Sequence, residues 1–352
     1  SAASKPGLPY DELIEEIDIG GPSMVRAAAK NHATVAIVTS PERYGPVLDA
    51  IDQFGSIPPG LRAVLAVDAF RRTAAYDARI AAELPARMSA VGLDLPDEPG
   101  FPGASDPYPD SLTVSFEKVE TLRYGENPHQ AAARYRRLGP GAADGPFASG
   151  AAPLQGKALS YNNVLDASAA DALARSLRGP GCVIVKHTNP CGVAERPTLL
   201  EAWQAAFEAD TVSAFGGVVA LNREVDGPVA QALASLFLEV VVAPGFTGEA
   251  RKTLAAKSNL RLIVDEGLAP APGAASTAVP DPTGSLRTAG GAVLVTTPDV
   301  LQDDPSTWTA ASRRPPTPAE LDDLDLAWRL VRGVTSNAIV LVRNAGTVGI
   351  GA

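Results

Sequence analysis

The sequence predicts an α/β fold in which helices cover a buried sheet. In the second half of the chain, short apolar runs rich in valine and isoleucine alternate with longer segments of helical periodicity. The composition is that of a globular protein with a large core, because 45% of the 352 residues are hydrophobic and 20% are charged. Prolines and glycines cluster at residues 92–110, where they suit neither an interior helix nor a central strand, and this cluster predicts a linker between two domains.

Before this linker, the sequence predicts one strand followed by helices. Residues 33–39 (ATVAIVT) form a short β-branched run, and Ser40 and Pro41 after it are residue types that begin a helix, here through Ile51. A longer helix is expected after residue 60. Its buried face is predicted to consist of small and apolar side chains, at Ala63, Val67, Phe70, Ala74, Ala78 and Ala81.

Beyond the linker, apolar runs predict strands and the segments between them predict helices. Thr317 and Glu320 have the spacing of a capping box, which predicts a helix reaching Arg332. The helices before it are expected at residues 199–207, 229–237 and around Leu254. Strands are expected at residues 182–185, 217–221, 240–243 and 260–264, followed by a hairpin of 338–342 and 347–350.

Charge and cysteine content exclude several classes of protein. A net charge of -10 and the lack of a basic tract disfavour nucleic-acid binding. No apolar run approaches the ~20 residues that span a bilayer, so we expect no membrane segment. Cys182 and Cys191 are too few for a disulfide framework and lack the partners of a zinc site, which favours the reducing cytoplasm and predicts no bound metal.

His187 is a candidate catalytic residue because it follows a predicted strand and opens the polar stretch 188–192. In open α/β sheets, ligands bind at the carboxyl ends of strands, and a neutral imidazole there can act as a general base. A loop histidine that only bonds its own turn is the alternative. Cys191 as a nucleophile and Lys186 as a Schiff-base lysine are further alternatives, but no orienting group or pyridine partner is evident for either.

Two other segments have the composition of ligand-binding loops. Residues 123–130 (RYGENPHQ) combine a guanidinium for phosphate with a phenol that can stack on a heterocycle, although a solvated polar turn would look similar. Gly20 and Gly21 precede a helix ending at Lys30, so free amide groups there could face an anion, or the glycines could simply begin the helix.

Six stretches of the sequence together resemble one known family. They are EIDIGGPSMVRAAAKNH at 16–32, LRYGENPHQ at 122–130, VKHTNPCG at 185–192, SAFGGVVAL at 213–221, VVVAPGF at 240–246 and VTSNAIVLV at 334–342. The chain is similar over nearly its whole length to the bifunctional purine-biosynthesis family in which AICAR transformylase is joined to IMP cyclohydrolase. The resemblance implies formyl transfer from the cosubstrate 10-formyltetrahydrofolate to AICAR, giving FAICAR, and then ring closure of FAICAR to IMP with loss of water.

For the formyl transfer, the resemblance implies a set of site residues. His187 would take a proton from the AICAR amine as it attacks the formyl carbon, and Lys186 would stabilise developing charge or help to protonate the leaving folate nitrogen. Arg123 and Tyr124 would hold AICAR, with Arg123 on its phosphate. Further substrate contacts would come from Phe215, Gly216, Asn337 and Glu239, the last at a position where the family usually has Asp.

For the ring closure, the resemblance implies that Lys30 donates or accepts the proton. Asp18 and the backbone of Ile19 would contact the nucleotide. Considered by itself, Lys30 could instead be a cation that complements the carboxyl end of an alanine-rich helix.

The resemblance also implies the domain order and the assembly. Residues 1–100 would be the C-terminal part of a methylglyoxal-synthase-like cyclohydrolase domain. Residues 101–352 would be the N-terminal part of a transformylase domain made of cytidine-deaminase-like α/β subdomains. Because both ends of the family pattern are missing, and Ser1 is not Met, we expect a fragment of a homodimer with shared active sites. A truncated nucleotide-binding module without catalysis is the alternative interpretation.

Overall fold

The computed structural model describes residues 8–93, 108, 111–138, 145–150, 152–269, 285–297, 299 and 304–352. The chain divides into two compact units, which are described separately. Unit 1 comprises Ser1–Glu117, Arg137–Ala142 and Val279–Pro298, and unit 2 comprises Lys118–Arg136, Ala143–Ala278 and Asp299–Ala352. Most of the expected linker at 92–110 lies outside the described residues.

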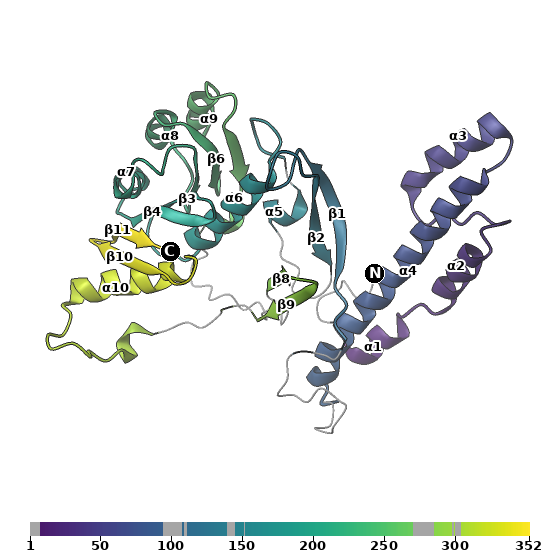
Figure 1. The fold of residues 1–352 in the computed structure, drawn as a ribbon. Coiled ribbons are helices and arrows are strands. Elements are labelled where there is room, and N and C mark those ends of the chain that lie inside the picture. The colour runs from purple at the N-terminus through teal and green to yellow at the C-terminus, as the bar shows by residue number, and fades with distance from the viewer. Residues whose placement is uncertain are drawn as a thin grey trace. The chain divides into compact units, whose positions relative to one another are not determined.

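Unit 2 is built around a mixed sheet of seven strands (Figure 1). The strands β5, β6 and β7 are parallel to one another, while β3, β4, β10 and β11 pair antiparallel with their neighbours. This sheet confirms the predicted α/β fold. In spatial order the strands are β10 (Ile339–Arg343), β11 (Gly346–Gly351), β4 (Asn189–Glu195), β3 (Gly181–Lys186), β5 (Gly217–Leu221), β6 (Leu238–Ala243) and β7 (Arg261–Val264).

Helices cover both faces of this sheet because its strands alternate their side chains between two cores. Cys182 and Ile184 face one core, to which α7 (Leu199–Ala209), α8 (Gly227–Ala234) and α9 (Gly248–Leu254) contribute. Val183 and Val185 face the other core, formed with α6 (Tyr161–Ala174) and α10 (Pro318–Val331). All four strand residues are fully buried, so the central strand is apolar on both sides.

The predicted elements of unit 2 are largely confirmed. The strands at 182–185, 217–221, 240–243 and 260–264 coincide with β3, β5, β6 and β7 to within a few residues, as do the helices at 199–207 and around Leu254. The helix expected at 229–237 ends earlier, at Ala234, because β6 begins at Leu238. The capping box is present, since the Thr317 hydroxyl accepts the Glu320 amide and the Glu320 side chain accepts the Thr317 amide.

The hairpin of β10 and β11 is also confirmed. Asn344 and Ala345 form its turn with φ of 51° and 52°, the left-handed conformation that two-residue hairpin turns require. Asp323 on α10 accepts both turn amides, at 2.9 Å from Asn344 and 2.7 Å from Ala345. The helix therefore fixes the turn of the hairpin that packs beside it.

Unit 1 is mainly helical. Its helices are α1 (Tyr10–Glu15), α2 (Gly20–Lys30), α3 (Tyr44–Phe54) and α4 (Pro59–Ala90), with the short turn η2 (Pro41–Arg43) before α3. The helix expected after Ser40 and Pro41 is thus confirmed. The strand expected at 33–39 is wrong, because no strand pairs with that segment in the described part of the chain. Arg62 on α4 instead donates to the carbonyl groups of His32 and Ala33, at 2.9 and 2.7 Å.

The long helix α4 is present, but its predicted buried face is wrong. Val67 and Phe70 are 47% and 40% exposed, whereas Ala66 and Ala69 are buried against Ala29 of α2. The buried face is therefore rotated by about one residue from the predicted one. Periodicity alone did not distinguish two adjacent faces that are both rich in alanine.

Several elements were not predicted from the sequence. They are the helices α1 and α6, the strand β4, the paired strands β1 (Ser115–Leu122) and β2 (Ala132–Leu138), the hairpin of β8 (Ser285–Ala289) and β9 (Ala292–Thr296), the helix α5 (Pro146–Ser149), and the turns η3 (Glu266–Leu268) and η4 (Pro305–Thr307). None of the helices in the described residues has the length and apolar character needed to span a membrane.

A buried carboxyl group makes the stability of unit 2 depend on pH. Asp171 on α6 is 7% exposed, and its Oδ2 accepts from Arg175 at 2.8 Å while its Oδ1 is buried without a hydrogen-bond partner. Burial raises the pKa of Asp171 to about 6, although Arg175 opposes the shift. Between the unfolded pKa of 3.8 and about 6, the folded protein binds the extra proton, so stability falls as pH rises through this window.

We expect Asp171→Asn to remove this loss. The difference in free energy of unfolding between Asp171→Asn and the parent should increase, in favour of the variant, by up to about 3 kcal/mol from pH 4 to pH 7. One pKa unit corresponds to about 1.4 kcal/mol. Urea unfolding at several pH values measures the difference. Asp322→Asn, an exposed change on α10, is the control. A difference between parent and Asp171→Asn that does not change with pH would contradict the assignment.

Candidate functional site

One edge of the seven-stranded sheet brings together predicted site residues from four separate stretches of sequence. β3 ends at this edge, while β5, β6, β7 and β10 begin there. The pairs Val185–Val218 and Val240–Arg261 place the starts of β5, β6 and β7 beside the end of β3. β10 begins there because β4, β11 and β10 are successively antiparallel. We call it the His187 edge, and it carries Lys186, His187, Phe215, Gly216, Glu239 and Asn337.

The environment of the edge differs from the expected one in two respects. It lies at the carboxyl end of β3 but at the amino ends of the parallel strands β5, β6 and β7, so the usual ligand site of a parallel sheet is not the one formed here. The polar stretch 188–192 is also not a loop, because residues from Asn189 onward belong to β4. Gly192 is buried inside the sheet, where a Cβ would overlap the carbonyl oxygen of Ala206 on α7.

His187 and Thr188 form the two-residue turn between β3 and β4. Lys186 pairs with Asn189 across the hairpin, and the two turn residues have φ of 54° and 64°. The carbonyl of His187 accepts from the Thr188 hydroxyl at 2.6 Å and from the side-chain Nδ2 of Asn189 at 3.3 Å. His187 itself is exposed, so its imidazole is accessible to a ligand at the tip of the hairpin.

Lys186 and Phe215 are directly connected. The ammonium group of Lys186 donates to the carbonyl oxygen of Phe215 at 3.0 Å. Gly216 follows with φ of 72°, and its amide donates to the carbonyl of Phe237 at 2.8 Å. The rings of Phe215 and Phe237 lie 5.3 Å apart between centroids, and Phe215 is 57% exposed. The edge therefore combines a cation with an exposed aromatic surface.

Glu239 is held by two residues that the sequence analysis missed. Asn163 on α6 donates to Glu239 Oε2 at 2.6 Å, and Arg261 at the start of β7 lies 3.7 Å from the same oxygen. Burial lowers the pKa of Arg261; Glu239 opposes this shift and the charge of Arg123 adds to it. Asn163 also forms a capping box with Ser160 at the start of α6, and neither this helix nor its link to Glu239 was predicted from the sequence.

The loop containing Arg123 and Tyr124 is closed by its own hydrogen bonds. Gln130 accepts the amides of Gly125 and Asn127, through its carbonyl and its side chain respectively, both at 2.8 Å. The guanidinium of Arg123 lies 5.4 Å from the centre of the Tyr124 ring. Asn162 on α6 donates to the carbonyl of Glu126 at 3.3 Å, which joins this loop to the helix that also holds Glu239.

Asn337 precedes β10 and is exposed. Its side-chain oxygen accepts from the Ser336 hydroxyl at 3.2 Å, and the nearby Thr335 amide donates to Asn189 Oδ1 at 2.8 Å. The segment before β10 is thus bonded to the first residue of β4, immediately after the His187 turn.

A cavity of about 380 Å³ lies beside Lys186 and His187 and includes Cys191 and Asp210. Burial raises the pKa of Cys191 to about 11, and its thiol donates to the carbonyl of Ile184 at 3.6 Å. A protonated thiol bonded to its own hairpin does not suit the nucleophile considered from the sequence. Hydrogen bonds from Ser213 and Val212 lower the pKa of Asp210, which keeps a carboxylate on this wall.

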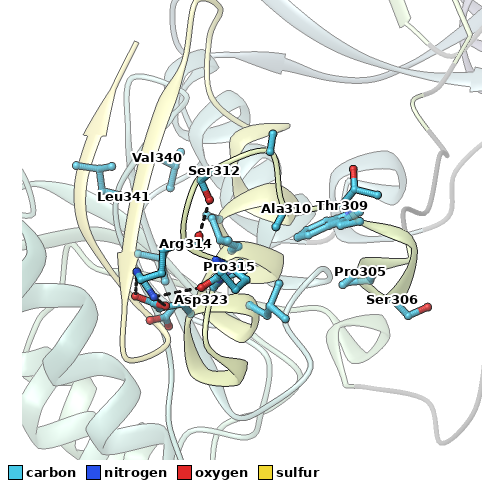
Figure 2. A pocket seen from close by; sticks show the side chains of 18 residues that line it. Pro305, Ser306, Thr309, Ala310, Ser312, Arg314, Pro315, Asp323, Val340 and Leu341 are labelled. Carbon is cyan, nitrogen blue, oxygen red and sulfur yellow. Dashed lines mark hydrogen bonds and ion pairs between the residues drawn. The ribbon is translucent and has the colours of Figure 1, made fainter.

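A larger cavity of about 760 Å³ is formed by α10, β10 and residues 305–316 (Figure 2). Its lining is mostly apolar, and it includes Arg314, which forms two hydrogen bonds of 2.8 Å with Glu320. It shares no lining residue with the His187 edge in the described part of the chain. The smaller cavity is the more relevant one for chemistry, because an imidazole and an ammonium group line it.

In unit 1, the three predicted residues lie at opposite ends of α2. Asp18 and Ile19 precede the helix, whereas Lys30 is its last residue and is exposed. Eleven residues give a helix of about 15 Å, so the two ends are not brought together by α2 alone. Asp18 Oδ1 accepts the Gly21 amide at 2.8 Å. The free amide expected at Gly21 is therefore already bonded to a carboxylate.

Among the residues that the structure describes, no three or more His, Cys, Asp and Glu side chains are grouped so that they could hold a metal ion.

Comparison with known proteins identifies the family of this chain. A family model described as "AICARFT/IMPCHase bienzyme" matches residues 28–352. The "Bifunctional purine biosynthesis protein PurH" of Synechococcus sp. (strain CC9605) is 45% identical over 360 residues, covering 99% of this chain and 63% of that protein. The protein of the same name from Bacillus subtilis (strain 168) is 44% identical over 349 residues, with coverage of 99% and 63%.

A third relative of that name, from Parasynechococcus marenigrum (strain WH8102), is 47% identical over 352 residues, covering 97% of this chain and 62% of that protein. The chain thus spans less than two thirds of the length of these relatives. Because the family model covers most of the chain and agrees with the resemblance carried by the six sequence stretches, the chain belongs to the AICARFT/IMPCHase bienzyme family.

Proposed function

We propose that this chain is part of an enzyme that transfers a formyl group from 10-formyltetrahydrofolate to AICAR and then closes the ring of the product FAICAR to give IMP. Membership of the bienzyme family and the names of the relatives support both activities. The observation that carries the first activity is the meeting of Lys186, His187 and Phe215 with Glu239 and Asn337 at one sheet edge.

In the proposed formyl transfer, His187 is the general base. The AICAR amine is a weak nucleophile because its lone pair is delocalised into an imidazole that carries a carboxamide. Its attack on the formyl carbon therefore needs both positioning and removal of a proton. The exposed imidazole of His187, at the tip of a hairpin anchored in a buried sheet, suits both requirements.

Lys186 is proposed to stabilise charge during the same step. Its ammonium group has three donors, one of which is used by the carbonyl of Phe215. The remaining two can donate to the formyl oxygen as negative charge develops there, or to the folate nitrogen as it leaves. The exposed ring of Phe215, with Gly216 beside it, supplies an apolar surface on which a planar heterocycle can stack.

The remaining substrate contacts are proposed for Arg123, Tyr124, Glu239 and Asn337. Arg123 would bind the phosphate of AICAR through its planar pair of donors. Glu239 has a fixed carboxylate that can accept from substrate amino or hydroxyl groups, because Asn163 and Arg261 orient it. The resemblance to the family implies an Asp at this position, and Glu239 is longer than an Asp by one methylene group.

Ring closure is assigned to unit 1, with Lys30 as the proton donor or acceptor and Asp18 and Ile19 as nucleotide contacts. The support is the resemblance of the stretch 16–32 to the family, of which residues 28–32, with Lys30, lie within the segment that the family model matches. Because Asp18 and Lys30 flank a helix of about 15 Å, the proposal requires that further groups complete the site around Lys30.

The proposal includes the organisation of the whole protein. Residues 1–100 belong to the cyclohydrolase domain and residues 101–352 to the transformylase domain. The enzyme is a cytoplasmic homodimer whose transformylase sites draw residues from both chains, and it acts on AICAR, FAICAR and IMP without binding nucleic acid or membrane. The acidic net charge supports the last point.

Separate assays of the two steps with the complete polypeptide test the function. Formyl transfer is followed by consumption of 10-formyltetrahydrofolate with AICAR, and ring closure by conversion of FAICAR to IMP. Both reactions are expected. Binding of AICAR without either reaction would instead identify the non-catalytic nucleotide-binding module.

Arg123→Lys is expected to weaken AICAR binding by about 10- to 100-fold although the charge is kept. A guanidinium offers two parallel donors to phosphate oxygens and an ammonium does not, and one charged hydrogen bond is worth about 1.5–3 kcal/mol. Calorimetric titration with AICAR and with its phosphate-free nucleoside measures the effect, and Arg251→Lys on the surface of α9 is the control. If parent and Arg123→Lys bound AICAR with equal affinity, Arg123 would not bind the phosphate, and residues 123–130 would have only a structural role as a turn.

A further inference from the structure

We propose that Asp166 on α6 is a positioning residue that fixes the direction of the His187 imidazole by bonding the backbone of the His187-Thr188 turn. The role in formyl transfer rests on the proposed function. The contact itself does not, because the carboxylate of Asp166 accepts the amide of Thr188 at 2.7 Å.

The turn has a conformation that the side chain of Thr188 disfavours. Two-residue hairpin turns with both residues at positive φ are usually built from Asn and Gly. Here His187 and Thr188 take φ of 54° and 64°, and a β-branched residue such as Thr is an outlier in this region. Such a conformation persists only where the surroundings hold it, and such positions cluster at functional sites.

Asp166 holds the turn from outside the hairpin. The other hydrogen bonds of the turn backbone, from the Thr188 hydroxyl and from Asn189 to the carbonyl of His187, arise within the hairpin itself. Asp166, in contrast, lies on α6, outside the hairpin, and its carboxylate accepts the backbone amide of Thr188. A carboxylate that accepts a backbone amide is a strong acceptor, roughly twice as strong as a neutral one.

The helix that carries Asp166 is a rigid support. Its first turn is closed by the capping box of Ser160 and Asn163, and the neighbouring Ala167 and Ala170 are completely buried in the core. The same helix holds Glu239 through Asn163. One helix therefore connects the proposed general base and a proposed substrate contact to the core of the sheet.

A fixed turn matters because the direction of an imidazole follows its own backbone. If the Thr188 amide is released, His187 and Thr188 can relax toward more favourable backbone angles, and the imidazole moves with them. A displacement of about 1 Å at a reacting group can cost about 100-fold in rate. The loss should appear in kcat, since Asp166 has no proposed contact with AICAR.

The test compares Asp166→Ala and Asp166→Asn in the complete polypeptide. Asp166→Ala should lower kcat for formyl transfer by about 10- to 100-fold, with KM for AICAR within about twofold of the parent. Asp166→Asn retains an acceptor oxygen and should keep kcat within about threefold. Ser168→Ala on the same helix is the control and should be unchanged. Unchanged kcat in Asp166→Ala, or equal losses in the Ala and Asn variants, would overturn the proposal.

A second variant separates positioning from a general folding defect. Gly accepts positive φ without cost, so Thr188→Gly should let the turn form without help from Asp166. In the Thr188→Gly background, Asp166→Ala should therefore cost less than in the parent. An undiminished cost in that background would contradict the role of the turn. Ring closure, assigned to unit 1, serves as the internal check on folding.

Hydrogen exchange at the Thr188 amide tests the contact without any assay of activity. Exchange should be faster in Asp166→Ala than in the parent and Asp166→Asn, while the amides of β3 keep their protection. If the parent shows no formyl transfer, the proposed function fails, and the exchange experiment still decides whether Asp166 holds the turn. Identical Thr188 exchange in the parent and Asp166→Ala would show that it does not.

Discussion

Replacing His187 with Ala is expected to lower formyl transfer by about 10²- to 10⁴-fold and to leave ring closure nearly unchanged. Removal of a general base costs this much in rate, and the AICAR amine cannot attack efficiently while it retains its proton. His187 is exposed at the tip of the hairpin, so its loss leaves no cavity in the core and little change in stability. Separate assays of the two steps on purified variant and parent measure both activities.

The control for this variant is His32→Ala, which removes a different exposed imidazole and should leave formyl transfer intact. An equal loss of both activities in His187→Ala would point to a folding defect. If His187→Ala retained formyl transfer within about threefold of the parent, His187 would not be the general base and would have only a structural role in the turn.

Replacing Lys30 with Ala is expected to have the opposite effect, lowering ring closure by about 10²-fold or more while formyl transfer continues. The lysine is proposed to move the proton during dehydration, and a positioned acid or base contributes at least that factor. FAICAR should then accumulate when AICAR and 10-formyltetrahydrofolate are supplied. Quantifying FAICAR and IMP over time measures the effect directly.

The alternative role of Lys30 predicts a much smaller change. A cation at the carboxyl end of α2 stabilises the helix by about 0.3–1 kcal/mol, which would alter stability and not the ring-closing rate. Arg72→Ala, an exposed cation on α4, is the matched control. Undiminished ring closure in Lys30→Ala would leave Lys30 with this helix-end role alone.

Most strands of the unit 2 sheet, and the helix α10, were predictable because their signals are local, whereas α6 and β4 were not predicted. Apolar runs of the right length became β3, β5, β6 and β7, and the spacing of Thr317 and Glu320 identified the start of α10. The strand expected at 33–39 failed because a β-branched run also needs a partner strand, which no local pattern specifies. The antiparallel pairing of β3 and β4 was likewise not predictable. The turn between them consists of His187 and Thr188 and lacks the Asn and Gly that are typical of hairpin turns.

The sequence was sufficient to propose the candidate site as a set of residues, but not to predict their arrangement. Resemblance to the family supplied Lys186, His187 and Glu239, and the structure adds which residues hold them. Asn163 and Asp166 lie on α6, distant in sequence from the groups they contact, so their roles depend on tertiary packing. From the sequence, Arg261 was predicted only to lie in a strand. Its interaction with Glu239 became evident from the structure, where it is buried beside that carboxylate.

A crystal structure of the complete protein with AICAR bound would show whether AICAR reacts at the His187 edge, as proposed. We expect the AICAR amine within about 3.5 Å of an imidazole nitrogen of His187 and the phosphate bonded to the guanidinium of Arg123. AICAR bound elsewhere, for example in the apolar cavity between α10 and β10, with His187 and Arg123 unoccupied, would contradict it.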